Sequence, residues 1–156
     1  MTEAPQDRNT SRNALTELGA RYCIGVDRRD PEIFLPIWTA DGEYIVGRRA
    51  GRFRGTDELK TALNFVAEAY ASTRHWTTNH LIEFQSDTEA TGLSDSFALC
   101  VTYDDQPCLV AASYDDRYSF QDGQWLIQKR EVTRWFVSEP MNLGLTYPSR
   151  PTADEN

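Results

Sequence analysis

Residues 109–137 have the sequence LVAASYDDRYSFQDGQWLIQKREVTRWFV, and this stretch decides the fold. Two segments rich in valine, isoleucine, threonine and aromatic residues, 109–120 and 125–137, flank the pair Asp122-Gly123. An Asp-Gly pair between such segments is typical of a two-residue hairpin turn. The pattern predicts two long antiparallel strands at the end of a sheet.

Two more segments of the same composition precede this hairpin, at residues 75–84 and 90–103. Turn residues at Ser86-Asp87 and Asp104-Asp105 separate the segments. We therefore expect four consecutive antiparallel strands from His75 onwards.

The first half of the chain has mainly helical patterns. Thr10 or Ser11 can cap a first helix, Asp30-Pro31 can start a short second one, and Thr56 can cap a third over 57–72. The apolar residues of the first helix recur at helical spacing, and they are Leu15, Leu18, Tyr22 and Val26.

One strand is expected between the second and third helices. The turn Asp41-Gly42 should lead into a strand over 43–47, and the arginine-rich residues 48–54 should form a loop or a hairpin edge.

Helices that precede a run of strands indicate an α+β domain. We predict a cone-shaped α+β barrel, in which the N-terminal helices pack on a strongly curved, mostly antiparallel sheet that encloses a pocket. The barrel should span residues 10–137, after a disordered N-terminus at 1–9. The proline-spaced tail 138–156 should serve as a lid, contact another subunit or pack on its own domain.

Composition narrows the functional class. A net charge of −8 argues against nucleic acid and anionic membranes as partners. The residues Cys23, Cys100 and Cys108 form no CxxC pair, and with two histidines a metal site would lack conventional ligands. We therefore expect neither a metal nor a cofactor. We expect a cytoplasmic protein, because no signal peptide and no membrane-spanning run is visible.

A carboxylate and an imidazole stand out for their positions. Asp27 lies near the predicted C-terminus of the first helix, where the helix dipole disfavours negative charge, and His75 opens a strand. Each alone can be structural, as a solvated cap or a satisfied strand histidine. If the helix packs over the strand, Asp27 can orient His75 as a general base.

The motifs Tyr22-x4-Asp27 and Arg74-His75-Trp76-Thr77-Thr78-Asn79, in this order of elements, resemble the SnoaL-like branch of the nuclear-transport-factor-2-like superfamily. The resemblance runs from about Ser11 to Val137. It is strongest to scytalone dehydratases, hexachlorocyclohexane dehydrochlorinase and bile-acid 7α-dehydratases. It implies that Asp27 and His75 fall on a catalytic dyad and that the protein is a homo-oligomer, with a trimer favoured over a dimer.

Tyr22 departs from one of these families. The dehydrochlorinase has a halide-binding lysine at this position, whereas the bile-acid dehydratases have a tyrosine. A tyrosine can donate a hydrogen bond to a leaving hydroxyl group. Scytalone dehydratases instead place a tyrosine directly before the aspartate, where this chain has Val26, and use a second histidine in the next strand, which this chain lacks.

Several polar residues are candidates for substrate binding. Tyr44 matches a scytalone dehydratase tyrosine in position, which implies a role in substrate binding; the alternative is an aromatic residue of the barrel wall. Arg130 falls near a dehydrochlorinase arginine. Arg130 and Arg134 share a strand face with apolar residues, so each needs an ion-pair partner or a ligand anion. Asp95, either a buried polar site or a strand-edge residue, and Asn79 complete the set.

His80 is expected to be structural. It lies five residues after His75, so strict strand alternation points it to the opposite face.

These observations predict a cofactor-independent lyase of the dehydratase type. His75 would remove a carbon-bound proton from a small, hydrophobic, cyclic substrate, and Tyr22 would assist the loss of water. The alternatives are an isomerase or polyketide cyclase of the same fold, and a non-catalytic domain that binds a small ligand.

Overall fold

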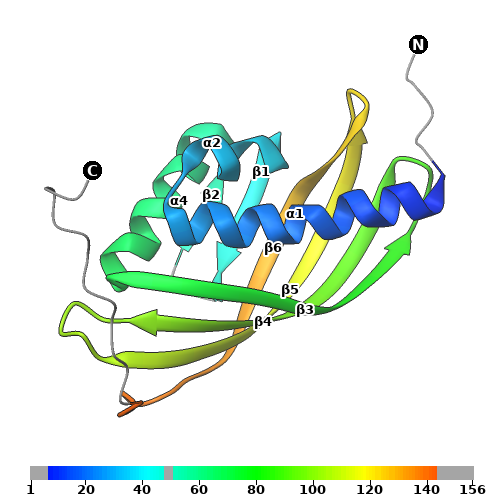
Figure 1. Cartoon of the computed structure of the whole chain (residues 1–156). Coiled ribbons are helices and arrows are strands. Elements are labelled where there is room, and N and C mark those ends of the chain that lie inside the picture. The colour runs from blue at the N-terminus through cyan, green and yellow to red at the C-terminus, as the bar shows by residue number, and fades with distance from the viewer. Residues whose placement is uncertain (1–6, 48–50, 144–156) are drawn as a thin grey trace, which may run out of the picture.

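The computed structural model describes residues 7–47 and 51–143. Its elements follow the predicted order, and Figure 1 shows them. They are α1 (Arg8–Arg28), α2 (Pro31–Phe34), η1 (Leu35–Ile37), β1 (Trp38–Val46), β2 (Gly51–Arg54), α4 (Gly55–Ala69), β3 (Ser72–Phe84), β4 (Glu89–Val101), β5 (Pro107–Gln121) and β6 (Gln124–Val137).

The strands form one six-stranded sheet in the order β2-β1-β6-β5-β4-β3. All neighbouring pairs are antiparallel except β1 and β6, which run parallel. The sheet curves but does not close, since β2 and β3 remain as edges. The predicted α+β class and the mostly antiparallel curved sheet are confirmed, although the sheet is an open one.

The β5–β6 hairpin turns where the sequence predicts it. Asp122 and Gly123 are the only residues between the two strands, with φ angles of 50° and 80°. Two consecutive positive φ angles define the type I′ turn that an Asp-Gly pair favours. The other long strands begin one to three residues earlier than predicted.

The helices cover the concave face of the sheet. Figure 1 shows α1 crossing above β3, with α4 beside β1 and β2. The predicted apolar face of α1 is buried, and it packs with β-strand side chains in the main core. Gly25 permits close packing of α2 on α1, because a Cβ atom there would lie 2.9 Å from the Cβ atom of Phe34.

The helix starts differ from the predicted ones. The carboxylate of Asp7 accepts hydrogen bonds from the backbone of Asn9 and Thr10, so α1 begins at Arg8 rather than after Thr10 or Ser11. Residues 7–9 thus belong to the helix and its cap, and residues 1–6 lie outside the described part of the chain. Helix α4 has no side-chain cap and begins before Thr56.

The first strand is longer than predicted. Asp41-Gly42 was expected to form a turn, but both residues lie inside β1. The pairing of β1 with β6 shifts register between Trp38 and Glu43, which absorbs the irregularity. The expected hairpin edge is present as β2, which pairs with the end of β1.

The described part of the tail follows its own domain. The backbone N–H groups of Ser138 and Met141 donate to the carbonyl oxygens of Leu109 and Pro107 at the start of β5. Residues 144–156 lie outside the described part of the chain, so the predicted lid or subunit contact is not tested there. None of the helices in the described ranges is both long and apolar enough to cross a membrane.

Candidate active site

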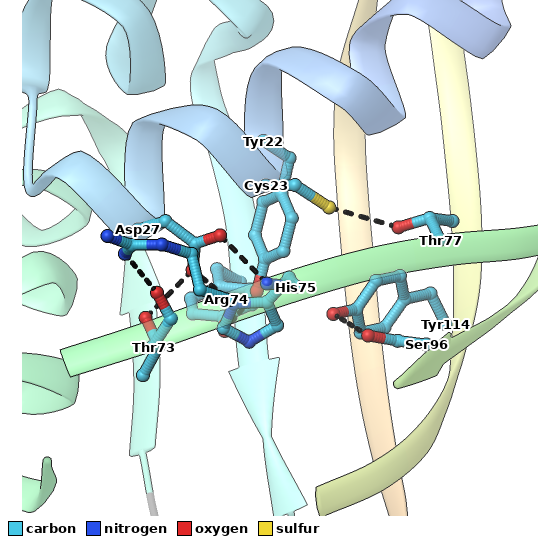
Figure 2. A network of polar contacts seen from close by, with 10 residues as sticks. Tyr22, Cys23, Asp27, Thr73, Arg74, His75, Thr77, Ser96 and Tyr114 are labelled. Atoms are coloured by element: carbon cyan, nitrogen blue, oxygen red, sulfur yellow. Dashed lines mark hydrogen bonds and ion pairs between the residues drawn. The ribbon is translucent and has the colours of Figure 1, made fainter. Parts of the chain in front are cut away.

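Asp27 and His75 meet between the last turn of α1 and the start of β3. The Nδ1 atom of His75 lies 2.6 Å from Oδ1 of Asp27, and the backbone N–H of His75 donates to Oδ2 at 2.8 Å. The side chains of Asp27 and His75 are only 12% and 15% exposed, respectively. Figure 2 shows the carboxylate reaching from α1 to the histidine on the edge strand.

A third donor holds the carboxylate. The hydroxyl group of Thr73 donates to Oδ1 of Asp27 at 2.8 Å. Burial alone would raise the pKa of Asp27, but the hydrogen bonds from His75 and Thr73 outweigh it and lower the pKa below its ordinary value. The carboxylate is therefore ionised at neutral pH.

The ionised carboxylate fixes the tautomer of His75. Because an ionised carboxylate can only accept hydrogen bonds, Nδ1 of the neutral ring carries the proton and donates it towards Asp27. The lone pair of the ring then lies on Nε2. In the neutral ring Nε2 is therefore the nitrogen that can accept a proton, and the role of His75 as a base stays a prediction.

His75 lines a cavity between α4 and the concave face of the sheet. Its volume is about 130 Å³. The walls are mostly apolar and aromatic, and the lining residues are Tyr22, Tyr44, Val46, Phe65, Val66, Ala69, Tyr70, Thr73, His75, Ser96, Ala98, Cys100, Val110, Ala112, Tyr114, Val132 and Arg134.

Two predicted tyrosines meet in this cavity. The hydroxyl groups of Tyr22 and Tyr44 lie 2.6 Å apart, and both side chains are buried. Burial raises the pKa of both phenols, so they remain protonated at neutral pH. In Figure 2, Tyr22 extends from α1 towards His75.

Arg130 lies behind the tyrosines and is not among the residues that line this cavity. It is 1% exposed, and its Nε and Nη2 atoms donate to the two carboxylate oxygens of Asp116 at 2.8 and 2.7 Å. Its guanidinium carbon lies 4.3 Å from the ring centres of both Tyr22 and Tyr114. Arg130 therefore has the ion-pair partner that its position requires, and Arg134 is the arginine that lines the cavity.

Asp95 and Asn79 are brought together, but away from the cavity. The side-chain amide of Asn79 donates to Oδ2 of Asp95 at 2.8 Å. Neither residue lines the cavity. Asp95 alternates with the buried residues Ser94 and Ser96 on β4, so it occupies the outer face of the sheet. Asp95 is thus neither the buried polar site nor the strand-edge residue that was expected, because it lies in the middle of the interior strand β4, on its outer face.

A bulge corrects the predicted orientation of His80. Two residues of β3, Asn79 and His80, oppose one residue of β4, and Asn79 has a φ of 53°. The extra residue returns His80 to the inner face, where its Nε2 atom lies 3.0 Å from the hydroxyl group of Tyr118. Simple alternation fails here, because a bulge shifts the phase of the strand by one residue.

His80 is the first member of a series of hydrogen-bonded side chains that runs through Tyr118 and Asp116 to Arg130. Tyr118 donates its proton to Asp116 at 2.7 Å, so Nε2 of His80 must donate to Tyr118. Asp116 in turn holds Arg130. Burial lowers the pKa of His80, which keeps it neutral. This arrangement agrees with the structural role expected of His80.

Four polar residues of this region were not among the predicted site residues. They are Thr73, Ser96, Tyr114 and Asp116. Tyr114 donates to Ser96 at 2.8 Å in the cavity wall. The signal for Thr73 was its strand parity with His75, and that for Asp116 was its parity with Tyr114 and Tyr118. Among the described residues there is no group of three or more histidine, cysteine or acidic side chains that could hold a metal ion.

Comparisons with known proteins agree with this architecture. Hexachlorocyclohexane dehydrochlorinase 1 from Sphingobium indicum is 33% identical over 125 residues, which cover 79% of this chain and 80% of the relative. A gamma-hexachlorocyclohexane dehydrochlorinase from the same species is 31% identical over 134 residues, 84% of this chain and 85% of the relative.

Solved structures of similar proteins share the fold of this chain. A type-3 hexachlorocyclohexane dehydrochlorinase from Novosphingobium barchaimii superposes with a TM-score of 0.83 at 28% identity, covering 91% of this chain and 97% of the other. A putative scytalone dehydratase from Novosphingobium aromaticivorans, at 23% identity, shares the fold with a TM-score of 0.75 over 83% and 87% of the two chains. The SnoaL-like domain model matches residues 7–131. Over most of its length, then, this chain belongs to the SnoaL-like domain family.

Proposed function

We propose that this chain is a cofactor-independent lyase that removes a carbon-bound proton with His75 and Asp27 and then eliminates water. The curated relatives are named as dehydrochlorinases, which are lyases, and the chain is an enzyme of that class. The substrate is a small, hydrophobic, cyclic molecule, in keeping with the hexachlorocyclohexane in the names of the relatives.

The hydrogen-bond geometry of the dyad carries this proposal. His75 is held by two contacts to one carboxylate, through Nδ1 and through its backbone N–H. The ionised Asp27 stabilises the imidazolium that forms when Nε2 takes a proton. A base that is held and electrostatically supported in an apolar cavity suits proton removal from carbon.

Tyr22 favours water over halide as the leaving group. A buried phenol with a raised pKa remains a neutral hydrogen-bond donor, whereas the lysine of the dehydrochlorinases supplies a full positive charge. Tyr22 donates to the leaving oxygen, and Tyr44 orients Tyr22. As the C–O bond breaks and the C=C bond forms, the proton taken by His75 completes the departing water, so the enzyme is unchanged overall.

The size of the cavity limits the substrate. A closed apolar cavity of about 150 Å³ is known to hold a benzene molecule. The cavity here, at about 130 Å³, is therefore matched to a single six-membered ring, with further groups extending through its mouth. Aromatic and aliphatic walls exclude water from the reacting carbon.

Two probes separate the possible outcomes. With 3-hydroxycyclohexanone, whose ring proton is acidified by the ketone, we expect loss of water and the absorbance of a conjugated enone. With gamma-hexachlorocyclohexane, we expect little release of chloride. Chloride release without enone formation would make the chain a dehydrochlorinase, and a product of unchanged mass would make it an isomerase.

The dyad is tested in the same assay. His75→Ala and Asp27→Asn should each lower turnover at least a thousandfold while circular dichroism and the melting temperature show a folded protein. Asp95→Asn is the matched control, since Asp95 lies outside the cavity. Full activity of a folded His75→Ala variant would refute the mechanism.

We also propose that the chain assembles into a homo-oligomer, with a trimer favoured over a dimer. Trp76, Phe97 and Phe136 are 41–53% exposed, and the pairing register places them in one row across the outer face of the sheet. A second copy of this chain would cover this apolar row. Light scattering should give a multiple of the chain mass for the wild type and a monomer for Phe97→Glu; a monomeric wild type would contradict the proposal.

A further inference from the structure

Among the residues that the structure describes, Arg134 is the one permanently charged residue that lines the cavity. The other lining side chains of the described ranges are apolar, aromatic, hydroxyl-bearing or thiol-bearing, apart from the imidazole of His75, and none of them is a carboxylate. Arg134 projects from the inner face of β6, in register with Ala112 of β5, and it is exposed at the mouth. A fixed positive charge therefore stands at the entrance to an apolar cavity.

Within the described ranges this charge has no ion-pair or hydrogen-bond partner. The ion pairs and side-chain hydrogen bonds of the described ranges do not include Arg134. Arg130, on the same face four residues earlier, makes a two-point contact with Asp116. A guanidinium beside apolar surface is stabilised by a hydrogen-bonded anion, which Arg130 has and Arg134 lacks within the described ranges.

The position of Arg134 relative to the dyad is fixed by the register. Thr77, Ser96, Ala112 and Arg134 lie directly across from one another on β3, β4, β5 and β6. Three steps between strands amount to about 14 Å on a flat sheet, and curvature shortens this span. His75 lies two residues before Thr77 on the same face, a further offset of roughly 7 Å along β3. Both side chains reach into the same cavity, which shortens the gap between their polar ends.

We propose that Arg134 is a specificity residue that binds a carboxylate group of the substrate at the cavity mouth. The inference rests on the proposed function and names its substrate class: a ring-bearing carboxylic acid, with the ring over Ala112 and the reacting C–H bond at His75. The fork of the guanidinium matches a carboxylate in a two-point contact. The net charge of −8 would repel anions from the rest of the surface, so Arg134 selects where an acid enters.

Binding of two small probes tests the proposal without any turnover. Benzoate and benzamide have nearly the same shape, but at pH 7 only benzoate is an anion. Titration calorimetry at low ionic strength, followed by protein NMR to locate the bound probe, should give a dissociation constant for benzoate at least ten times smaller than for benzamide. The shifted NMR signals should include those of Ala98 and Ala112, which line the cavity.

Variants assign the preference to one side chain. Arg134→Gln should weaken benzoate binding at least tenfold and leave benzamide binding unchanged, and Arg134→Lys should retain part of the preference. Arg117→Gln is the matched control, because it removes an exposed arginine of β5 that does not line the cavity. It should bind benzoate as the wild type does.

The results separate this inference from the proposed function. If His75→Ala keeps full activity but benzoate is still preferred, the mechanism fails and the anion subsite stands. Equal binding of benzoate and benzamide, unchanged benzoate binding in Arg134→Gln, or no benzoate binding at millimolar concentration would each overturn the subsite.

Discussion

The hydroxyl group of Thr73 lies 2.8 Å from Oδ1 of Asp27, the oxygen atom that also accepts the ring N–H of His75. Thr73 is only 4% exposed, so water does not replace this donor when it is removed. In the proposed mechanism Thr73 therefore positions the carboxylate of Asp27 and, through it, the ring of His75.

Replacing Thr73 by valine keeps the shape of the side chain and removes the donor. A hydrogen bond to a charged group contributes about 1.5–3 kcal/mol, so we expect kcat/KM in the enone assay to fall about tenfold or more. The acid limb of the pH–rate profile should also move to higher pH, because Asp27 loses a donor to its ionised form. Thr78→Val, on the exposed face, is the control; an unmoved profile in Thr73→Val would contradict the positioning role.

Asp27 should contribute to acid stability. Its pKa is lower in the folded chain than in the unfolded chain, so the carboxylate stabilises the fold above the unfolded value of about 3.9. This contribution disappears as the pH falls through the folded pKa. Urea denaturation between pH 7 and pH 3 should therefore show a smaller loss of unfolding free energy in Asp27→Asn than in the wild type. An equal loss of unfolding free energy in the two proteins would contradict this prediction.

The buried ion pair should be more costly to break than to remove. Arg130→Met leaves the carboxylate of Asp116 unpaired inside the core, and we expect a loss of about 3–5 kcal/mol in unfolding free energy. Adding Asp116→Leu removes the orphaned charge and should recover part of that loss. A double-mutant cycle in urea measures the coupling, and simple additivity of the two changes would be inconsistent with it.

The three thiols should be unreactive in the folded chain. Cys23, Cys100 and Cys108 are buried and free, and burial raises the pKa of each, that of Cys100 to about 12. The thiolate is the reactive form, so its fraction at pH 8 is very small. Mass spectrometry should show no addition of iodoacetamide to the native protein and three additions in urea. Rapid labelling of any native thiol would contradict this expectation.

Local chemistry made much of the fold predictable. The Asp122-Gly123 turn and the cap of α2 by Asp30 depend on a few neighbouring residues, whose backbone preferences are strong. The apolar face of α1 follows from helical spacing. The meeting of Asp27 with His75 was predicted because that face had to pack on the sheet, with the carboxylate at the last turn of α1 and the histidine at the start of β3.

The rest depended on pairing between distant strands. The bulge at Asn79 exists because of its register with β4, and nothing in the residues around His80 reveals it. The partner of Arg130 lies 14 positions away on the neighbouring strand, so parity alone left a ligand and an ion pair as equal alternatives. Asp41-Gly42 has the chemistry of a turn, but the register shift in β1 accommodates it within a strand.

The dyad and the opposite wall of the cavity come from different segments of the chain. Asp27 lies on α1 and His75 on the edge strand β3. By contrast, Phe65 lies on α4, Tyr70 directly follows α4, and Arg134 lies near the end of β6. If Asp27 and His75 act as proposed, substitutions at these other positions can change the substrate while the dyad stays in place. The same division gives evolution, and protein engineers, a route to new substrates that does not require a new reaction.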